Sequence, residues 1–473
     1  MDFDPGFWED KVINLIFKFE KMLKSNKEEY FDIDDFIDII DIYLDMNKIE
    51  AAEKAVDIAI KYHPLSVDII TLKAEVYLKK NELNKAFKVL KFAQTLNEDS
   101  IDLILTWGFY YHKCRQNQKA KMFFERAIAK SNGDDLKDTL LFIARFYSDE
   151  KEHLQSIEYF NRLYEIDTEN LDVIFELASL YYEVDDYESA LLMLDAGLDV
   201  DPLDFLFWQL KGDVYHTLNK IPEAIDAYEN SLAIEPGSYF AFYGLSNLYF
   251  LQKEYKKSLE VNKIYTDEFF DDEYSCYNNG CCYYEMGEYD KAIENFQKSM
   301  AYDSTPDPYL TWFGLGKAYY KLKDYDKSCE YFKKTLDINP DLDYVWLYLG
   351  YVQLESGRYL HAANSFEKAA NCNPENDEAC DCYFKITYNF LGIDEAYRVI
   401  CEIIEKNPNN PKYLLLKTAC LIELDRIDEA EQELRTAIAQ KPSLDDFFIF
   451  YPKIKELENF MHIIEQQIKT QKK

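Results

Sequence analysis

The 473-residue chain is poor in the residues that make tight turns, with 14 glycines and 13 prolines. Average usage of these two residues would be about twice as high. A β-sandwich or β-barrel needs such residues every few positions, so the composition disfavours both folds. Hydrophobic residues nevertheless make up 48% of the chain, too many for a disordered protein. What remains is a folded chain without a strand-rich architecture.

Basic residues are also in short supply, because 53 lysines and arginines face 88 acids, for a net charge of −35. Phosphate contacts need clustered lysine and arginine, so we expect no binding of nucleic acid. Docking on an anionic membrane is disfavoured for the same reason.

Signals for export or membrane insertion are missing from the sequence as well. The first ten residues are acidic, and no apolar run reaches the ~18 residues of a membrane span. Ten cysteines without a C-x-x-C pair are too few for a disulfide scaffold. We therefore expect a cytoplasmic protein.

The sequence does contain a strong internal repeat. A common register begins at residues 33, 67, 101, 137, 171, 205, 239, 273, 309, 343, 377 and 411, giving ten repeats of 34 residues and two of 36. Position 20 is small in all twelve repeats, and position 11 is Tyr in the first nine. Position 8 is small in nine: Ala74, Gly108, Ala144, Ala178, Gly212, Ser246, Gly280, Gly316 and Gly350.

These columns predict two antiparallel helices in each repeat. Positions 4, 8 and 11 share one helical face, and positions 20, 24 and 27 share another. Glycine inside a helix costs about 1 kcal/mol relative to alanine, so its recurrence at position 8 implies a close helix contact. Proline at position 32 ends the second helix in seven repeats. Phe384 at position 8 and Asn262 at position 24 depart from the pattern.

This pattern resembles the tetratricopeptide repeat, over residues 33–444. The resemblance implies an all-α superhelical solenoid of antiparallel helix pairs. Segments 1–32 and 445–473 are then expected to be an N-terminal capping helix and C-terminal capping helices with a basic tail; a dimer contact or docking helix is the alternative. Their apolar stripes comprise Trp8, Val12, Leu15, Ile16, Phe19, Met22 and Leu23, and Phe447, Phe450, Ile454, Leu457, Met461 and Ile464.

No constellation of residues points to catalysis. The six histidines form no H-E-x-x-H motif, and His112 and Cys114 are two apart on a predicted helix, so they point in different directions. The segment 314–317 lacks the spacing of a phosphate-binding loop. We expect no enzyme activity, no cofactor and no metal.

In proteins that this sequence resembles, positions 2, 5, 9, 12 and 13 of each repeat line a concave groove. Transferred to this chain, these positions are acidic in the first two repeats, which would attract a basic segment. A solvated acidic face is the alternative. The acidic residues are Asp34, Asp41, Asp45, Asp68 and Glu75.

The same positions are aromatic in the central repeats, where large rings would anchor a partner. Helix packing alone is the alternative for the rings at positions 5 and 12. The predicted patch is Phe240, Tyr243, Asn247, Phe250, Tyr274, Tyr277, Tyr284, Phe313, Lys317, Tyr320, Tyr344 and Tyr351.

The resemblance implies a scaffold that binds an extended or helical peptide segment, with apolar anchors and a basic stretch. A regulatory or substrate-recruiting subunit of an enzyme with a separate catalytic chain is the alternative. Some family members clamp a C-terminal carboxylate with Lys at position 5 and Asn at position 9. No repeat here has that lysine, so we do not expect this clamp.

Overall fold

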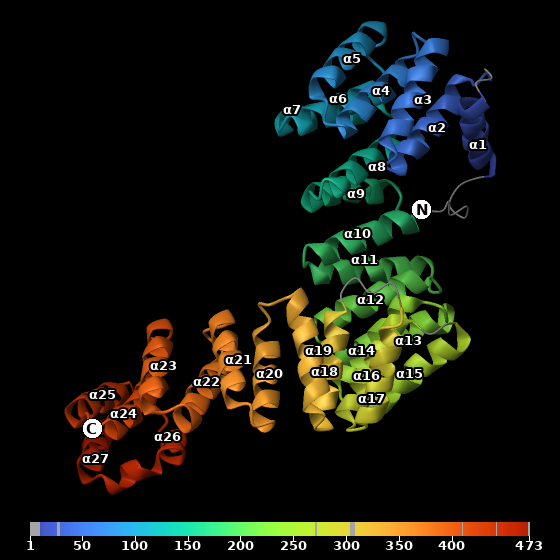
Figure 1. Cartoon of the computed structure of the whole chain (residues 1–473). Helices are drawn as coiled ribbons and strands as arrows, with labels where there is room; N and C mark the ends of the chain where they lie inside the picture. Colours follow the sequence, from blue (N-terminus) through green and yellow to red (C-terminus); the bar gives the residue numbers. More distant parts are fainter. Residues whose placement is uncertain are drawn as a thin grey trace. The chain divides into compact units, whose positions relative to one another are not determined.

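A computed structural model describes residues 10–25, 29–269, 272–302, 308–408, 410–440 and 442–471. Within these residues the chain is helical and contains no strand (Figure 1). The described residues fall into two compact units, the N-terminal unit Met1–Leu218 and the C-terminal unit Asn219–Lys473.

The N-terminal unit contains twelve helices in its described part. They are α1 (Asp10–Ser25), α2 (Ile33–Asp45), α3 (Ile49–Tyr62), α4 (Val67–Lys79), α5 (Leu83–Leu96), α6 (Ile101–Lys113), α7 (Asn117–Lys130), α8 (Asp134–Asp149), α9 (His153–Ile166), α10 (Leu171–Glu183), α11 (Tyr187–Val200) and α12 (Phe205–Thr217).

The C-terminal unit continues the series in its described residues. Its helices are α13 (Ile221–Ile234), α14 (Tyr239–Leu251), α15 (Tyr255–Glu268), α16 (Glu273–Glu285), α17 (Tyr289–Ser299), α18 (Tyr309–Lys321), α19 (Tyr325–Ile338), α20 (Asp343–Glu355), α21 (Tyr359–Cys372), α22 (Asp377–Phe390), α23 (Ile393–Lys406), α24 (Pro411–Glu423), α25 (Ile427–Ala439), α26 (Asp445–Phe450) and α27 (Glu458–Gln471). A short 3₁₀ helix, η2, spans Pro452–Glu456.

Within each unit, successive helices pack as antiparallel pairs, which confirms the predicted all-α fold. We call the even-numbered helices α2–α24 the A helices and the odd-numbered helices α3–α25 the B helices. Within a unit, each B helix packs on the A helix before it and on the A helix after it. Every A helix therefore has two B-helix neighbours in the interior of a unit.

The turn from A helix to B helix uses one residue with left-handed backbone. Position 15 of the repeat has positive φ in eleven of the twelve repeats, from Asn47 (φ 54°) to Asp425 (φ 60°). Glycine fills this position only at Gly287 and Gly357, so most of these turns accept the steric cost of a side chain. The recurring turn was not among the features predicted from the sequence.

The starts of many A helices are closed by a side chain in the preceding residue. Ser66 and Ser100 accept hydrogen bonds from backbone N–H groups three residues on, and Asp32 forms a capping box with Asp35. Such caps satisfy N–H groups that a helix start leaves free and contribute about 1 kcal/mol each. They fix where each repeat begins.

Four glycines at position 8, Gly108, Gly280, Gly316 and Gly350, lie against a phenyl ring from position 24 of the same repeat. A Cβ atom on Gly280 would lie 2.6 Å from Phe296, and one on Gly316 would lie 2.5 Å from the ring of Phe332. Both rings are buried, at 1% and 0% exposure. The absence of a side chain at position 8 thus makes room for the largest core side chain of the B helix.

Two departures from the repeat pattern have distinct structural outcomes. Asn262 is 3% exposed, and its side-chain amide donates to Asn278 (2.9 Å) and Asn279 (2.8 Å) on α16, so a polar contact replaces an apolar one. Phe384 is fully buried, and its ring centroid lies 5.7 Å from that of Phe450 in α26. Neither departure interrupts the helical stacking.

The predicted apolar stripes at the two ends are largely covered within the chain. Leu15, Ile16, Phe19 and Met22 of α1 are buried against α2 and α3, whereas Leu23 is 43% exposed and does not belong to that face. The side chains of Trp8 and Val12 lie outside the described residues. All six residues of the C-terminal stripe belong to clusters with α24, α25 or one another.

We predict that Gly280→Ala destabilises the C-terminal unit. An alanine in a helix is ordinarily worth about 1 kcal/mol more than glycine, but here its methyl group overlaps Phe296. Overpacking of this kind costs ~1–3 kcal/mol, so the urea midpoint measured by circular dichroism should fall. In a Phe296→Leu background the same substitution should cost less. Gln297→Ala on the exposed face of α17 is the matched control, and an equal effect in all backgrounds would contradict this account.

Candidate partner-binding surfaces

The acidic residues predicted in the first two repeats differ in their exposure. Three are exposed and two are half-buried between the A helices α2, α4 and α6. The exposed acids are Asp34, Asp45 and Asp68, and the half-buried acids are Asp41 and Glu75.

Asp41 lies on α2 in a strongly acidic environment. Burial, followed by the charges of Glu75, Asp45, Asp38 and Asp102 in that order of strength, raises its pKa to about 8. No lysine or arginine forms an ion pair with Asp41 among the described residues. A large part of this carboxylate is therefore protonated at neutral pH.

Glu75 occupies the corresponding position of α4. Burial raises its pKa to about 7, although the hydroxyl of Thr106 donates a hydrogen bond of 2.7 Å that favours the charged form. The charge of Asp102 raises the pKa as well, and Lys79 lowers it. Asp41 and Glu75 thus form the centre of an acidic cluster, in which Lys79 acts on Glu75 and on Asp45, and Arg145 acts on Asp45.

The sequence interpretation missed three members of this cluster. Asp38 and Thr106 occupy position 6 of their repeats, which was not assigned to the binding surface. Asp102 occupies position 2 of the third repeat and so follows Asp34 and Asp68 in register. The recurrence of Asp at position 2 was the signal that could have extended the cluster to α6.

The predicted aromatic residues are brought together on the A helices of the C-terminal unit, α14, α16, α18 and α20. The ring centroids of Tyr243 and Tyr274 are 3.8 Å apart, and those of Phe313 and Tyr344 are 5.0 Å apart in an edge-on arrangement. Burial raises the pKa of Tyr277, followed by Cys281 and then by the hydroxyls of Tyr309 and Tyr344. Rings thus meet between α14 and α16 and between α18 and α20.

Lys317 on α18 lies within this aromatic group. Its Nζ atom is 4.5 Å from the ring centroid of Tyr284 and 5.4 Å from that of Phe313. Cation–π contacts of this geometry are worth about 0.5–1 kcal/mol at exposed sites. Aromatic rings, and not carboxylates, surround Lys317. The residue therefore places a positive charge on this part of an otherwise acidic protein.

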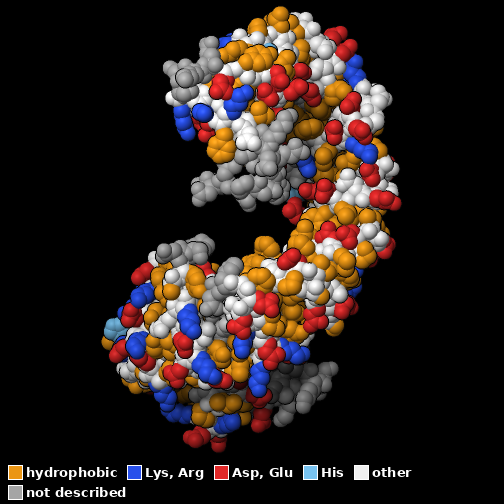
Figure 2. Space-filling view, turned by 90° about the vertical axis from the view of Figure 1, so that its right-hand side faces the viewer, with side chains coloured by type: hydrophobic (Ala, Val, Ile, Leu, Met, Phe, Trp, Pro, Cys, Tyr) orange, Lys and Arg blue, Asp and Glu red, His pale blue; other side chains and the backbone are white. Residues whose placement is uncertain are grey.

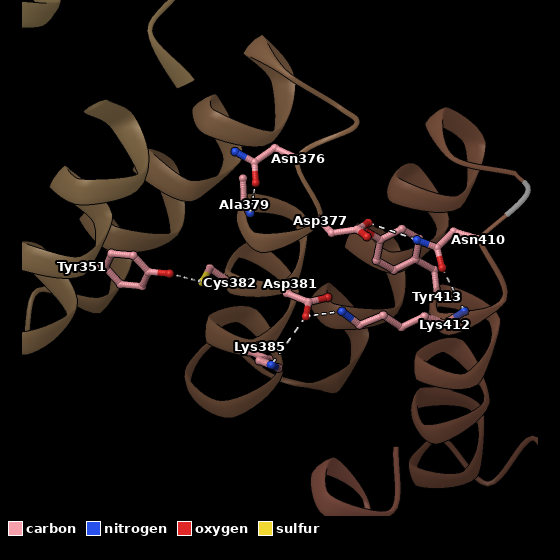
Figure 3. Close-up of polar contacts among 10 residues, drawn as sticks. All are labelled: Tyr351, Asn376, Asp377, Ala379, Asp381, Cys382, Lys385, Asn410, Lys412 and Tyr413. Carbon is pink, nitrogen blue, oxygen red and sulfur yellow. Dashed lines mark hydrogen bonds and ion pairs between the residues drawn. The ribbon is translucent and has the colours of Figure 1, made fainter. Parts of the chain in front are cut away.

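Polar contacts continue the surface toward α22 and α24 (Figure 3). The hydroxyl of Tyr351 donates to Glu378 at 2.6 Å and lies 3.2 Å from the sulfur of Cys382. Farther along, Lys412 and Lys385 are both directed at Asp381. Aromatic contacts therefore give way to ion pairs after α20.

The predicted aromatic residues differ in how far their side chains are exposed to solvent. Phe240 is 64% exposed and Tyr243 is 42% exposed, whereas Tyr274, Tyr277 and the remaining members are half-buried. Phe250 packs on Tyr255 of the following B helix, with centroids 5.6 Å apart. Figure 2 shows that exposed hydrophobic side chains lie among acidic ones over the face it displays.

Several residues of the aromatic surface were not predicted. Tyr348 lies at position 6 of its repeat and packs edge-on against Phe313, with centroids 5.4 Å apart. Tyr239 at position 1 contacts both Phe240 and Tyr243. The set of five groove positions excluded positions 1 and 6, and no signal in a single sequence corrects that choice.

The geometry defines a helical-repeat protein whose A helices carry surface acids and aromatics. Four family models described as tetratricopeptide repeat match the chain, at residues 37–100, 147–214, 206–238 and 273–306 together with 309–342. The chain belongs to the tetratricopeptide-repeat proteins, as its sequence pattern predicted. Proteins built from these repeats are scaffolds for protein–protein interaction.

Among curated proteins, the chain is similar to the TPR repeat-containing protein MJ1428 of Methanocaldococcus jannaschii. The two are 22% identical over 507 aligned positions, which cover 95% of this chain and 81% of that protein. A second protein of this organism, MJ0941, is 31% identical over 72 residues, or 15% of this chain and 21% of that protein.

Two solved structures illustrate the similarity in fold. The APC/C hetero-tetramer Cut9–Hcn1 is 15% identical, with 87% of this chain and 93% of that chain covered and a TM-score of 0.39. A tetratricopeptide repeat protein from Parabacteroides merdae is 14% identical, with 54% of this chain and 99% of that chain covered and a TM-score of 0.43.

Neither a membrane span nor a metal site is found among the residues that the structure describes. None of these helices combines the length and apolarity that crossing a membrane requires. No group of three or more His, Cys, Asp or Glu side chains there is placed to hold a metal ion.

We predict that the Asp41–Glu75 cluster makes the N-terminal unit less stable as pH rises. Both folded-state pKa values lie above those of an unfolded chain, so the folded state binds more protons between about pH 4 and 8 and loses that advantage as pH rises through 7 to 8. The variant Asp41→Asn with Glu75→Gln should lose much of this dependence, by on the order of 1 kcal/mol between pH 6 and 8.5.

Urea midpoints at pH 6 and 8.5 measure this effect. Asp34→Asn, which removes an exposed carboxylate from the same helix, is the control. If the double variant and the control show the same pH dependence as the unmodified chain, the two carboxylates do not repel one another as described.

Proposed function

We propose that this protein is a non-enzymatic scaffold that binds an extended or helical segment of a partner protein along its A helices. In this proposal, residues 33–444 form twelve repeats between the end segments 1–32 and 445–473, and the A helices line a concave groove. The observation that carries the proposal is the series of contacts across α14, α16, α18 and α20, in which rings meet between α14 and α16 and between α18 and α20, and Lys317 of α18 lies over Tyr284 of α16.

The aromatic surface supports binding of apolar anchors. Tyrosine and phenylalanine offer a large contact area while few rotatable bonds are frozen on binding, which is why such side chains dominate interface energetics. Phe240 and Tyr243 are already exposed, and Tyr344 is half-buried beside Phe313. Tyrosine hydroxyls add hydrogen-bonding groups at the same surface.

The acidic cluster of the N-terminal unit supports recognition of a basic stretch. Burial and the acidic neighbours of Asp41 and Glu75 raise the pKa of both groups, so a lysine or arginine placed between them would favour their charged forms and be held by them. Exposed Asp34, Asp45 and Asp68 would attract such a segment at longer range. The two surfaces lie in different units and are proposed as separate contact sites.

We predict that replacing exposed aromatic residues weakens peptide binding. Twelve-residue peptides are first selected on the unmodified protein by phage display. They should bind the variant Phe240→Ala, Tyr243→Ala, Tyr344→Ala about ten- to a hundred-fold more weakly. The reason is that hot-spot aromatic residues, singly or in combination, contribute ~2 kcal/mol or more to binding. Isothermal titration calorimetry measures the change in Kd.

The matched control replaces exposed apolar residues on B helices, Ile264→Ala and Leu360→Ala, which are 53% and 72% exposed. Both proteins must keep the helicity and melting temperature of the unmodified chain. Equal losses in both, or no loss in the aromatic variant, would remove the aromatic surface from the binding site.

We predict that peptides that bind the N-terminal unit are lysine- or arginine-rich and bind more weakly as salt increases. Exposed charges are screened within about 10 Å at 0.1 M ionic strength. The Kd of such a peptide should therefore rise between 50 and 500 mM NaCl, and Asp41→Asn with Glu75→Gln should flatten that rise. An affinity that does not change with salt would exclude the acidic cluster.

A further inference from the structure

The C-terminal segment of the chain lies against the A helices α22 and α24 as well as against the last B helix. Phe450, at the end of α26, packs its ring 5.1 Å from that of Tyr388 and 5.7 Å from that of Phe384, both on α22. In Figure 1, α26 lies beside the end of α22. The segment thus contacts the helices proposed to bind partners.

Two residues that follow Phe450 bind one carboxylate of α24. The hydroxyl of Tyr451 donates to Glu423 at 2.7 Å, and the Nζ atom of Lys453 lies 3.0 Å from the same oxygen. These two donors hold the pKa of Glu423 below its usual value. The segment that contacts α22 and α24 therefore presents an aromatic ring, a hydroxyl group and a lysine within four residues.

The receiving residues occupy defined positions of the repeat. Tyr388 is position 12 of one repeat, and Glu423 is position 13 of the next. Among consecutive repeats of this chain, the combination of Tyr and Glu at these positions occurs at one other place, Tyr320 and Glu355. In the N-terminal unit the same register holds Tyr182 and Thr217, which carry no charge.

In the pair Tyr320 and Glu355, the carboxylate of Glu355 accepts hydrogen bonds from neighbouring tyrosine hydroxyls. Tyr320 donates to Glu355 at 2.6 Å, and Tyr325 donates to it at 3.0 Å. Among the residues that the structure describes, no lysine or arginine forms an ion pair with Glu355, which is exposed. Its charge is thus unneutralised, whereas that of Glu423 is paired with Lys453.

We propose that Tyr320 and Glu355 form a subsite for a segment of a partner protein. That segment carries an aromatic residue followed within three residues by a lysine, as Phe450–Lys453 does where it contacts Tyr388 and Glu423. This inference rests on the proposed function and names the partner chemistry for one part of the aromatic surface. The partner's ring packs on Tyr320, and its lysine pairs with Glu355. The C-terminal segment keeps the later subsite filled, so partners in trans meet the earlier one.

Charge and position both favour this occupant. Glu355 ends α20, which also carries Tyr344 and Tyr351, so the subsite continues the aromatic surface. Tyr348 lies close enough to Tyr320 for its hydroxyl charge to raise the pKa of Tyr320, and Glu355 raises it more strongly. A cation at this place would neutralise the strongest local charge without displacing a packed side chain.

The test uses the full chain and a fluorescein-labelled peptide with the sequence of residues 445–457, which contains the aromatic residue and the lysine. Fluorescence anisotropy should show saturable binding to the unmodified protein. Glu355→Gln should weaken the Kd about ten-fold, as expected for loss of a charge-assisted contact. A peptide with methionine in place of Lys453, and with Lys455 kept, should bind with the same weakened Kd, and Glu355→Gln should then have no further effect.

Glu260→Gln, an exposed carboxylate on the B helix α15, is the matched control and should leave the Kd unchanged. No measurable binding, or binding that Glu355→Gln leaves unaltered, would overturn the assignment of this subsite. Suppose that Glu355→Gln leaves the Kd of the peptide unchanged, but that the variant Phe240→Ala, Tyr243→Ala, Tyr344→Ala no longer binds the peptide. The proposed function then stands and this inference fails. Peptide binding that neither variant weakens contradicts both the proposed function and this inference.

Discussion

Close packing of the position-24 side chain against a small position-8 residue joins the two helices of most repeats, and it is tightest where position 8 is glycine. In the repeats that contain Gly108, Gly280, Gly316 and Gly350, a phenyl ring from the B helix occupies the volume of the missing methyl group. The rings are buried, so each contact removes a large apolar surface from water. Because the contact lies between the two helices of one repeat, each pair can form from residues close in sequence.

That contact leaves the other faces of the A helices available for function. The Phe296 ring also reaches Gly314 of the following A helix, so one side chain fastens a B helix to both of its neighbours. Apolar and small positions thereby hold the stack together. Of positions 2, 5, 9, 12 and 13, some contribute to it as well, because Tyr277 and Phe313 at position 5 and Tyr351 at position 9 pack on the position-24 rings of their own repeats. Acids collect at these positions in the N-terminal unit, and aromatics collect there in the C-terminal unit.

Most of the fold could be predicted from the sequence because its determinants recur in a fixed register. Helix starts at Ile33, Val67 and Ile101 coincide with the predicted starts of the repeats. The left-handed residue at position 15 was missed because Lys253 or Asp185 at that place does not signal positive φ as glycine does. The Asn262–Asn278 contact was missed because a polar partner on another helix is invisible in a pattern of columns.

The binding surfaces could be predicted only in part. Rings such as Tyr243 at position 5 and Tyr274 at position 2 of the next repeat do meet across successive A helices. Burial of Asp41 and Glu75, and the raised pKa values that follow from it, depend on how closely α2, α4 and α6 approach. The contact of Phe450 with Tyr388 joins residues from different parts of the repeat register and required the three-dimensional arrangement.

The most direct test of the account is a crystal structure of the full chain with a peptide selected for binding to it. The account predicts electron density for the peptide along α14, α16, α18 and α20, with an apolar side chain between Tyr243 and Tyr344. Density on the B helices or on the end helices α1 and α27, with the A helices bare, would contradict it.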